Sequence, residues 1–192
     1  MPTQADAEPR LVVLASGTGS TLAALLDDDV LGRAVVAAGT DRPGCAAMQR
    51  AADAGVPTFA LALDACPDRS AWNAELAELV AAHEPDLVVL AGFMRVLAPS
   101  FVARFRIVNT HPALLPAHPG AHAIRDALAA GDAYTGVTVH WVDDGVDTGP
   151  VIAQVEVPVE AGDDEQTLQA RIQAAEKPLY VATVRKLCEE IA

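Results

Sequence analysis

Short aliphatic runs alternate with segments of helical periodicity almost to the end of the chain, and this alternation is what most limits the possible folds. The first four runs are short and apolar at successive positions, and they span 10–16, 34–40, 57–63 and 86–92. Runs of this kind are typical of parallel strands that are covered on both faces. The segments between them carry apolar residues at helical spacing, and Asp68 or Ser70 is suited to cap the longest. The pattern predicts an α/β fold with a mainly parallel sheet.

The second half of the chain continues the pattern with a change near its end. We expect strands over 105–110, 135–142 and 150–159, and helices over 123–132 and from about 164 to 188. Because no helix separates the last two strands, they are expected to pair antiparallel. The prediction is therefore a three-layer sandwich around a twisted sheet of about seven strands. A single domain over 10–192, preceded by a flexible tail over 1–9, fits this organisation.

Composition and charge exclude several classes of protein. Apolar residues make up 52% of the chain, which predicts a large core, and no apolar run reaches the roughly 18 to 20 residues of a membrane helix. The N-terminus lacks the apolar segment of a signal peptide, so a cytoplasmic protein without a membrane partner is expected. The net charge of −13 argues against a nucleic-acid partner, and an anionic substrate would have to be attracted locally. The three cysteines, Cys45, Cys66 and Cys188, lack metal-site spacing and are interpreted as thiols, without a disulfide or metal.

The loop after the first strand, "ASGTGST" (15–21), is a candidate anion site. Gly19 allows a tight turn, and the N–H groups near Ser20 and Thr21 would lie at a helix N-terminus, where amides and the helix dipole favour a phosphate. A dinucleotide site remains an alternative because Asp41 stands where a ribose-binding acid would, although the third glycine of that motif is missing. A simple helix-capping turn is the other alternative, whereas a P-loop is excluded because no Gly-Lys-Ser/Thr follows.

The stretch "NTHPALLPAHPG" (109–120) places polar residues and three prolines directly after a buried strand. Asn109 and His111 share strand parity, so both can point into one cleft, where an amide and an imidazole can stabilise an oxyanion and move a proton. In the acidic turn 142–151, Asp147 could favour the imidazolium form of His111 and orient its ring. Since no nucleophile motif is present, the predicted chemistry is acyl transfer without a covalent enzyme intermediate. The alternative is that both side chains merely cap the loop.

Other candidate residues are more ambiguous. The loop over 93–97 is too apolar for ordinary exposed backbone and is either core or the wall of a pocket for a flat ligand. Arg95 within it could reach solvent or form an ion pair. Surface or structural roles are expected for the histidines at 83, 118 and 122, and His140 could be either structural or functional.

Four ordered motifs resemble the folate-dependent formyltransferases that act on glycinamide ribonucleotide in purine biosynthesis. They are "SGTGS" (16–20), "AGFMRVL" (91–97), "NTHPALLPAHPG" (109–120) and "DTGPVI" (147–152). The resemblance covers nearly the whole chain from residue 10. It implies a formyltransferase fold with a Rossmann-like N-terminal half. It also implies transfer of a formyl group from 10-formyltetrahydrofolate to the amine of the ribonucleotide, with no metal.

The resemblance also implies roles for individual residues. The catalytic group would be Asn109, His111 and Asp147. The ribonucleotide would contact Gly19, Ser20, Thr21, Gln173, Ala174, Ala175 and Glu176. The folate would contact Arg69, Met94, Arg95, Val96, Leu97, Asn109, Asp143, Asp144, Gly145, Val146 and Asp147, with 143–147 closing over it. The partners implied are these small molecules, and the protein would be a monomer or homodimer.

Three residues depart from the family pattern, and three other classes of protein remain as alternatives. Thr21 stands where asparagine is common in the phosphate loop, and Thr110 and Trp141 replace an expected aliphatic residue and phenylalanine. A methionyl-tRNA formyltransferase would carry a second domain and an arginine-rich loop, and a formyltetrahydrofolate hydrolase an N-terminal regulatory domain. A nucleotide-binding regulatory module without chemistry is the rival from another class, and it is disfavoured because the polar trio is retained.

Overall fold

The structure, a computed structural model, describes residues 8–191, so most of the tail predicted over 1–9 lies outside the described residues. The chain divides into two compact units. Unit 1 holds the described residues up to Ile107 together with those from Val184 onward, and unit 2 is Val108–Thr183.

Unit 1 consists of four strands and the helices that connect them. Its elements are β1 (Leu11–Leu14), α1 (Ser20–Asp27), α2 (Leu31–Ala34), β2 (Val35–Thr40), α3 (Ala46–Asp53), β3 (Thr58–Ala60), the 3-10 helix η1 (Leu63–Ala65), α4 (Arg69–Ala81), β4 (Leu87–Leu90) and α5 (Pro99–Val102). The Asp68 carboxylate accepts a hydrogen bond from Ala71 N at 2.8 Å and caps α4, so of the two predicted caps Asp68 is confirmed.

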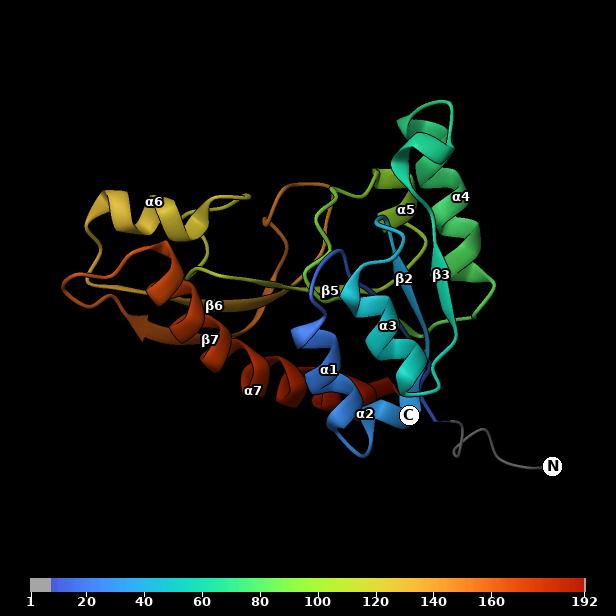
Figure 1. Cartoon of the computed structure of the whole chain (residues 1–192), viewed down its shortest axis with the longest axis horizontal. Helices are drawn as coiled ribbons and strands as arrows, with labels where there is room; N and C mark the ends of the chain where they lie inside the picture. The colour runs from blue at the N-terminus through green and yellow to red at the C-terminus, as the bar shows by residue number, and fades with distance from the viewer. Residues whose placement is uncertain (1–7, 192) are drawn as a thin grey trace. The chain divides into compact units, whose positions relative to one another are not determined.

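Strand β1 is the centre of unit 1, and its four residues are fully buried. It pairs in parallel with β2 on one side and with β4 on the other, while β3 continues the sheet beyond β2. The crossovers from β1 to β2 to β3 place α1 and α3 on one face, and the return crossover to β4 places α4 on the opposite face (Figure 1). Coverage on both faces explains the continuous apolar runs. The strand order reverses between β1 and β4, where sheets of this kind bind ligands.

Unit 2 is built on antiparallel strands. Its elements are β5 (Ile107–His111), α6 (Ala123–Ala130), β6 (Tyr134–Trp141), β7 (Val151–Pro158) and the greater part of α7 (Glu165–Ile191). Strand β6 pairs antiparallel with both β5 and β7, which confirms the expected antiparallel pairing of the last two strands. Val137 and Val157, from the neighbouring strands β6 and β7 (Figure 1), pack with Leu168 and Ile172 of α7 in a buried cluster.

The strand order is β3-β2-β1-β4-β5-β6-β7. This order, with parallel pairs at one end and antiparallel pairs at the other, confirms the predicted α/β fold with a sheet of about seven strands. The predicted boundaries agree with the observed elements to within a few residues. One difference is at 57–63, where only Thr58–Ala60 forms a strand and the chain then turns into η1.

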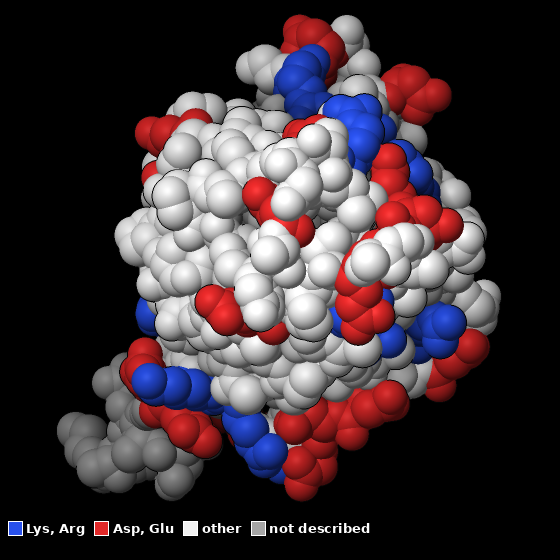
Figure 2. All heavy atoms as spheres, turned by 90° about the vertical axis from the view of Figure 1, so that its left-hand side faces the viewer, with Lys and Arg blue, Asp and Glu red and all other residues white. Residues whose placement is uncertain are grey.

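The face that Figure 2 shows carries both acidic and basic side chains. Acidic side chains are scattered over that face, and most of it is uncharged (Figure 2). Among residues 8–191, none of the helices is both long and apolar enough to cross a membrane. In the same part of the chain, no three His, Cys, Asp or Glu side chains gather to form a possible metal site.

Candidate active site

Antiparallel pairing of β5 with β6 places Asn109 directly opposite His140. Asn109 Nδ2 lies 3.3 Å from His140 Nε2, and His140 Nδ1 lies 2.9 Å from the carbonyl oxygen of Trp141. Because a carbonyl only accepts hydrogen bonds, Nδ1 of His140 carries a proton, while Nε2 faces the Asn109 amide. At least one of the two amide hydrogens of Asn109 is left to donate elsewhere.

His111, at the end of β5, has a protein acceptor beside each ring nitrogen. Nδ1 lies 3.3 Å from Asp147 Oδ2, and Nε2 lies 2.8 Å from the carbonyl oxygen of His118. The His111 residue is only 4% exposed. A doubly protonated imidazolium can donate to both acceptors, whereas either neutral tautomer would leave one nitrogen lone pair facing an oxygen. The site therefore suits a positively charged His111.

Asp147 is held in an unusual backbone conformation, with φ of +55°. Its Oδ2 accepts a hydrogen bond from Gly120 N at 2.7 Å, and its Oδ1 lies 3.6 Å from His140 Nε2. Burial raises the pKa of this carboxyl, but the contacts with His140, the Gly120 N–H and the His111 ring outweigh it, and the pKa is lowered from its ordinary value. Asp147 is therefore an anion that can balance an imidazolium.

The proline-rich loop 112–120 that follows β5, the proline corner, is held by two polar side chains of β6 and β7. The Thr138 hydroxyl, completely buried on β6, donates to the Ala113 carbonyl at 2.7 Å and accepts from Leu115 N at 3.0 Å. The Gln154 amide, which lies opposite Thr138 on β7, donates to the Leu115 carbonyl at 2.9 Å and to Thr138 Oγ1 at 2.8 Å. The Leu115–Pro116 peptide bond is cis. The loop is thus tied to the two strands beside it.

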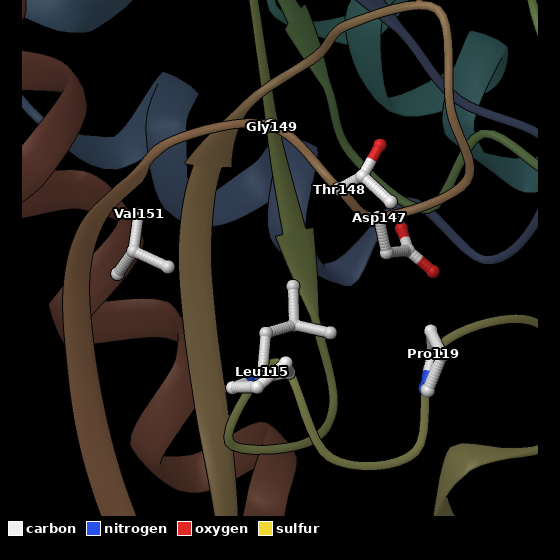
Figure 3. Close-up of a pocket in the computed structure, with 7 residues that line it drawn as sticks. Leu115, Pro119, Asp147, Thr148, Gly149 and Val151 are labelled. Atoms are coloured by element: carbon white, nitrogen blue, oxygen red, sulfur yellow. The ribbon is translucent and has the colours of Figure 1, made fainter.

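A pocket of about 250 Å³ lies against Asp147 in unit 2 (Figure 3). Its walls are mainly apolar, and the residues that line it are Leu115, Pro116, Pro119, Asp147, Thr148, Gly149 and Val151. Figure 3 shows the Asp147 carboxylate directed toward the side on which Pro119 lies. The carboxylate is therefore accessible from a concave, largely apolar surface.

The turn that leads into Asp147 is ordered by a side chain of its own. Asp143 Oδ1 accepts hydrogen bonds from Gly145 N at 3.1 Å and from the Thr148 hydroxyl at 2.7 Å. Asp144, Gly145 and Val146 are exposed. Four further predicted residues, Gln173, Ala174, Ala175 and Glu176, lie on α7, where Ala174 is exposed and the others are half-buried.

In unit 1, the predicted phosphate loop begins α1 with Gly19 in a left-handed conformation, at φ of +74°. A side chain here would place its Cβ 2.6 Å from Ala47 Cα of α3, so only glycine allows the two segments to approach. Ser20 and Thr21 form the first turn of α1, as predicted. Arg50 of α3 donates to the Thr18 carbonyl at 2.9 Å, which adds a cation that the sequence analysis did not include.

The predicted folate segment, 94–97, has a fixed backbone and exposed apolar side chains. Met94 and Val96 are 65% and 63% exposed, whereas Leu97 is buried. Arg69 of α4 donates to the Val96 carbonyl at 2.6 Å, and Met94 N donates to the Ser16 hydroxyl at 2.9 Å. The loop therefore holds two apolar side chains outward on a rigid frame, which favours the pocket-wall interpretation over that of core.

Asp41 has a different role from the one that a dinucleotide site would require. Its side chain is completely buried, Oδ1 accepts from the Ser16 hydroxyl at 2.5 Å, and Oδ2 contacts Arg95 Nε at 2.6 Å. Both oxygens are therefore already bound, which is inconsistent with a carboxylate that holds a ribose. Arg95 forms the ion pair that was one of its two expected states.

The structure thus brings together Asn109, His111 and Asp147 in unit 2 and, separately, Arg69 with the segment 94–97 in unit 1. Sequence reasoning did not assign four residues that support these groups: His140, Ser16, Asp41 and Arg50. A strand register would have been needed to find His140, because its contact with Asn109 follows from cross-strand pairing.

Comparisons with known proteins show the family to which the chain belongs. The sequence model of the formyl transferase family matches residues 9–184. A phosphoribosylglycinamide formyltransferase of Mycobacterium tuberculosis H37Rv is 56% identical over 186 residues, which are 95% of this chain and 86% of that protein. The trifunctional purine biosynthetic protein adenosine-3 of Drosophila melanogaster is 46% identical over 174 residues, which are 87% of this chain and 13% of that protein.

A solved structure is similar over most of the chain. The crystal structure of glycinamide ribonucleotide transformylase 1 from Symbiobacterium toebii is 42% identical, superposes with a TM-score of 0.91, and covers 95% of this chain and 88% of its own. The chain therefore belongs to the formyl transferase family, among its phosphoribosylglycinamide formyltransferases.

Proposed function

We propose that the protein transfers the formyl group of 10-formyltetrahydrofolate to the amine of phosphoribosylglycinamide, and that Asn109, His111 and Asp147 carry out the chemistry. The observation on which the proposal rests is the contact between His111 Nδ1 and Asp147 Oδ2 at 3.3 Å, with Asn109 two residues before His111 on the same strand. The names of the relatives supply the acceptor and the purine pathway.

The first step is attack of the amine nitrogen on the formyl carbon. A carbon–nitrogen bond forms, and the formyl oxygen becomes an oxyanion of a tetrahedral intermediate. The Asn109 amide hydrogen that His140 does not use donates to this oxygen, and the imidazolium charge of His111 stabilises it. One donor of this kind is worth roughly 3 to 4 kcal/mol of transition-state stabilisation.

The second step breaks the bond between the formyl carbon and N10 of the folate. The attacking nitrogen loses a proton and N10 gains one, so the proton count of the two substrates and two products is unchanged. His111, or a water held by Asp147, carries the proton. Asp147 keeps a negative charge beside the ring in either case, because its pKa is lowered.

The two substrates have separate requirements that residues of the chain meet. For the phosphate, the N-terminus of α1 at Gly19, Ser20 and Thr21 offers backbone amides, and on α7 the residues 173–176 are proposed for the rest of the ribonucleotide. For the folate, the exposed Met94 and Val96 offer apolar contacts to a flat ring on a backbone that Arg69 holds in place. The turn 143–147 is proposed to close over it.

We also propose a cytoplasmic enzyme that acts without a metal ion or nucleic acid, as a monomer or homodimer. The net charge of −13 argues against a tRNA substrate, because the protein would repel a polyanion.

The test is a spectrophotometric assay of deformylated folate, run with and without phosphoribosylglycinamide. We expect release that depends strictly on the ribonucleotide. Release at the same rate without it would identify a hydrolase and overturn the proposal, and absence of release in both conditions would favour a binding module. Met94→Ser, which removes an exposed apolar side chain, should raise KM for the folate and leave KM for the ribonucleotide unchanged.

A further inference from the structure

The carbonyl of His118 faces His111, and the side chain of His118 contacts Asp132, a residue outside the proline corner. His118 Nε2 lies 2.5 Å from Asp132 Oδ2, and the side chains of this pair are 20% and 36% exposed. The His118 carbonyl is the group that lies 2.8 Å from His111 Nε2. A continuous set of contacts therefore runs from Asp132 through His118 to the imidazole.

His118 adopts a conformation that needs outside support. Its φ is +50°, in the left-handed region that only a small minority of residues other than glycine occupy, and such a conformation persists only where the surroundings hold it. The prolines at 116 and 119 restrict the backbone on either side, and the contact with Asp132 fixes the side chain. The conformation directs the His118 carbonyl at His111.

Asp132 is placed by the end of α6. Gly131 has a φ of +72° and donates from its N–H to Leu128 O at 3.1 Å, while Asp132 N donates to Ala127 O at 3.2 Å. These two bonds form the Schellman motif that ends a helix in a fixed direction. The motif uses only backbone groups of Asp132, so its carboxylate is left for His118.

The same loop also holds Asp147. Gly120 lies two residues after His118, and its N–H donates to Asp147 Oδ2 at 2.7 Å. One short segment, 118–120, therefore supplies an acceptor to His111 and a donor to Asp147. A shift of this segment would move both members of the His111–Asp147 pair, and misplacement of reacting groups by about 1 Å can cost on the order of a hundredfold in rate.

We propose that Asp132 and the His118 side chain are positioning residues for His111: they hold the 118–120 loop so that the His118 carbonyl fixes His111 Nε2 in its protonated form and the ring faces Asp147. From the sequence, only a surface or structural role is expected for His118. The positioning role rests on the proposed function of His111.

The test compares Asp132→Ala with two other variants. Asp132→Asn keeps an oxygen that can accept from His118 Nε2 and should restore the anchor. Asp126→Ala is the matched control, because Asp126 on α6 has a side chain of similar exposure, 44%, and pairs with Arg125 instead. We expect Asp132→Ala to lower kcat about tenfold, with KM for both substrates within about twofold, as for a loss of positioning that spares binding. Asp132→Asn and Asp126→Ala should stay within about twofold of the wild-type kcat.

A second readout does not depend on turnover. Two-bond 15N–1H spectra of the histidine rings, with His111 assigned from the missing signals of His111→Gln, report which nitrogen carries a proton. In the wild type both ring nitrogens of His111 should carry a proton, and in Asp132→Ala the proton on Nε2 should be partly lost, with Asp126→Ala unchanged.

The outcomes separate this inference from the proposed function. Wild-type protein without formyl transfer would refute the function, whereas the ring spectra would still decide the positioning. Asp132→Ala with wild-type kcat or with an unchanged His111 spectrum would overturn the inference, as would an equal loss of kcat in Asp126→Ala.

Discussion

Asp147 meets His111 from a left-handed backbone conformation, with Oδ2 at 3.3 Å from Nδ1, and the same oxygen accepts from the Gly120 N–H at 2.7 Å. The carboxylate is therefore oriented by the loop that also carries the acceptor for the other ring nitrogen of His111. This arrangement gives the imidazole a fixed orientation and a compensating charge before any substrate binds. Preorganisation of this kind is what makes electrostatic stabilisation effective.

Thr138→Val should destabilise the proline corner while the volume of the side chain is kept. The change removes the hydroxyl that serves Ala113 O, Leu115 N and Gln154, and it leaves a buried donor and a buried acceptor without a partner. The expected loss is about 1 to 3 kcal/mol in the free energy of unfolding. Urea denaturation checks it, with Thr138→Ser as the control that keeps the hydroxyl. Equal stability of the Val and wild-type proteins would mean that these bonds contribute nothing.

Asp41→Asn should weaken folate binding more than it slows the reaction. The amide oxygen can still accept from Ser16, but the charge that holds Arg95 is lost, so the segment 94–97 becomes less well fixed. We expect KM for the folate to rise about tenfold with kcat within about threefold. Steady-state kinetics measure both, and Glu78→Gln, which breaks the exposed pair with Arg104, is the matched control. Unchanged KM in Asp41→Asn would show that the ion pair does not position the segment.

Asp163 should make the protein more sensitive to acid. Arg171, the Glu160 N–H and the Thr167 hydroxyl bind this carboxylate at the start of α7, so its pKa is well below the ordinary value of 3.8. The stabilisation from a lowered carboxyl pKa is fully present above about pH 4 and is lost as the pH falls further. The free energy of unfolding of Asp163→Asn should therefore be lower than that of wild type at pH 6, and this difference should become smaller at pH 3.

Urea denaturation at pH 6, 4 and 3 measures this difference for Asp163→Asn. Glu189→Gln, at an exposed position near the end of α7, serves as the control. A difference from wild type that stays constant down to pH 3 would contradict the assignment.

The order of the elements was predictable from the sequence because most strands of this fold have a recognisable local pattern of apolar residues. Strand β1 is completely buried, and so its residues are apolar at every position. The antiparallel pairing of β6 with β5 was not predicted, since a helix separates the two strands and a parallel crossover would have the same local pattern. Local periodicity carries no information on the direction of pairing.

The candidate site was predictable where residues are close in sequence or share a motif. Asn109 and His111 follow from strand parity, whereas the contacts of Asn109 with His140 and of Asp132 with His118 depend on register and on the direction in which a helix ends. Asp41 shows the same limit. Its position suggested a ribose ligand, but only the structure shows that Ser16 and Arg95 already bind both oxygens.

In the proposed mechanism His111 and Asp147 act as one unit in formyl transfer, and the sharpest test is kcat of Asp147→Asn at saturating concentrations of both substrates. Removal of the carboxylate charge should lower kcat by roughly 10²- to 10⁴-fold, the range for loss of a positioned acid–base group, while the melting curve stays cooperative. His122→Gln, on an exposed histidine at the start of α6, should retain wild-type kcat. Turnover of Asp147→Asn at the wild-type rate would show that the Asp147 charge takes no part in formyl transfer.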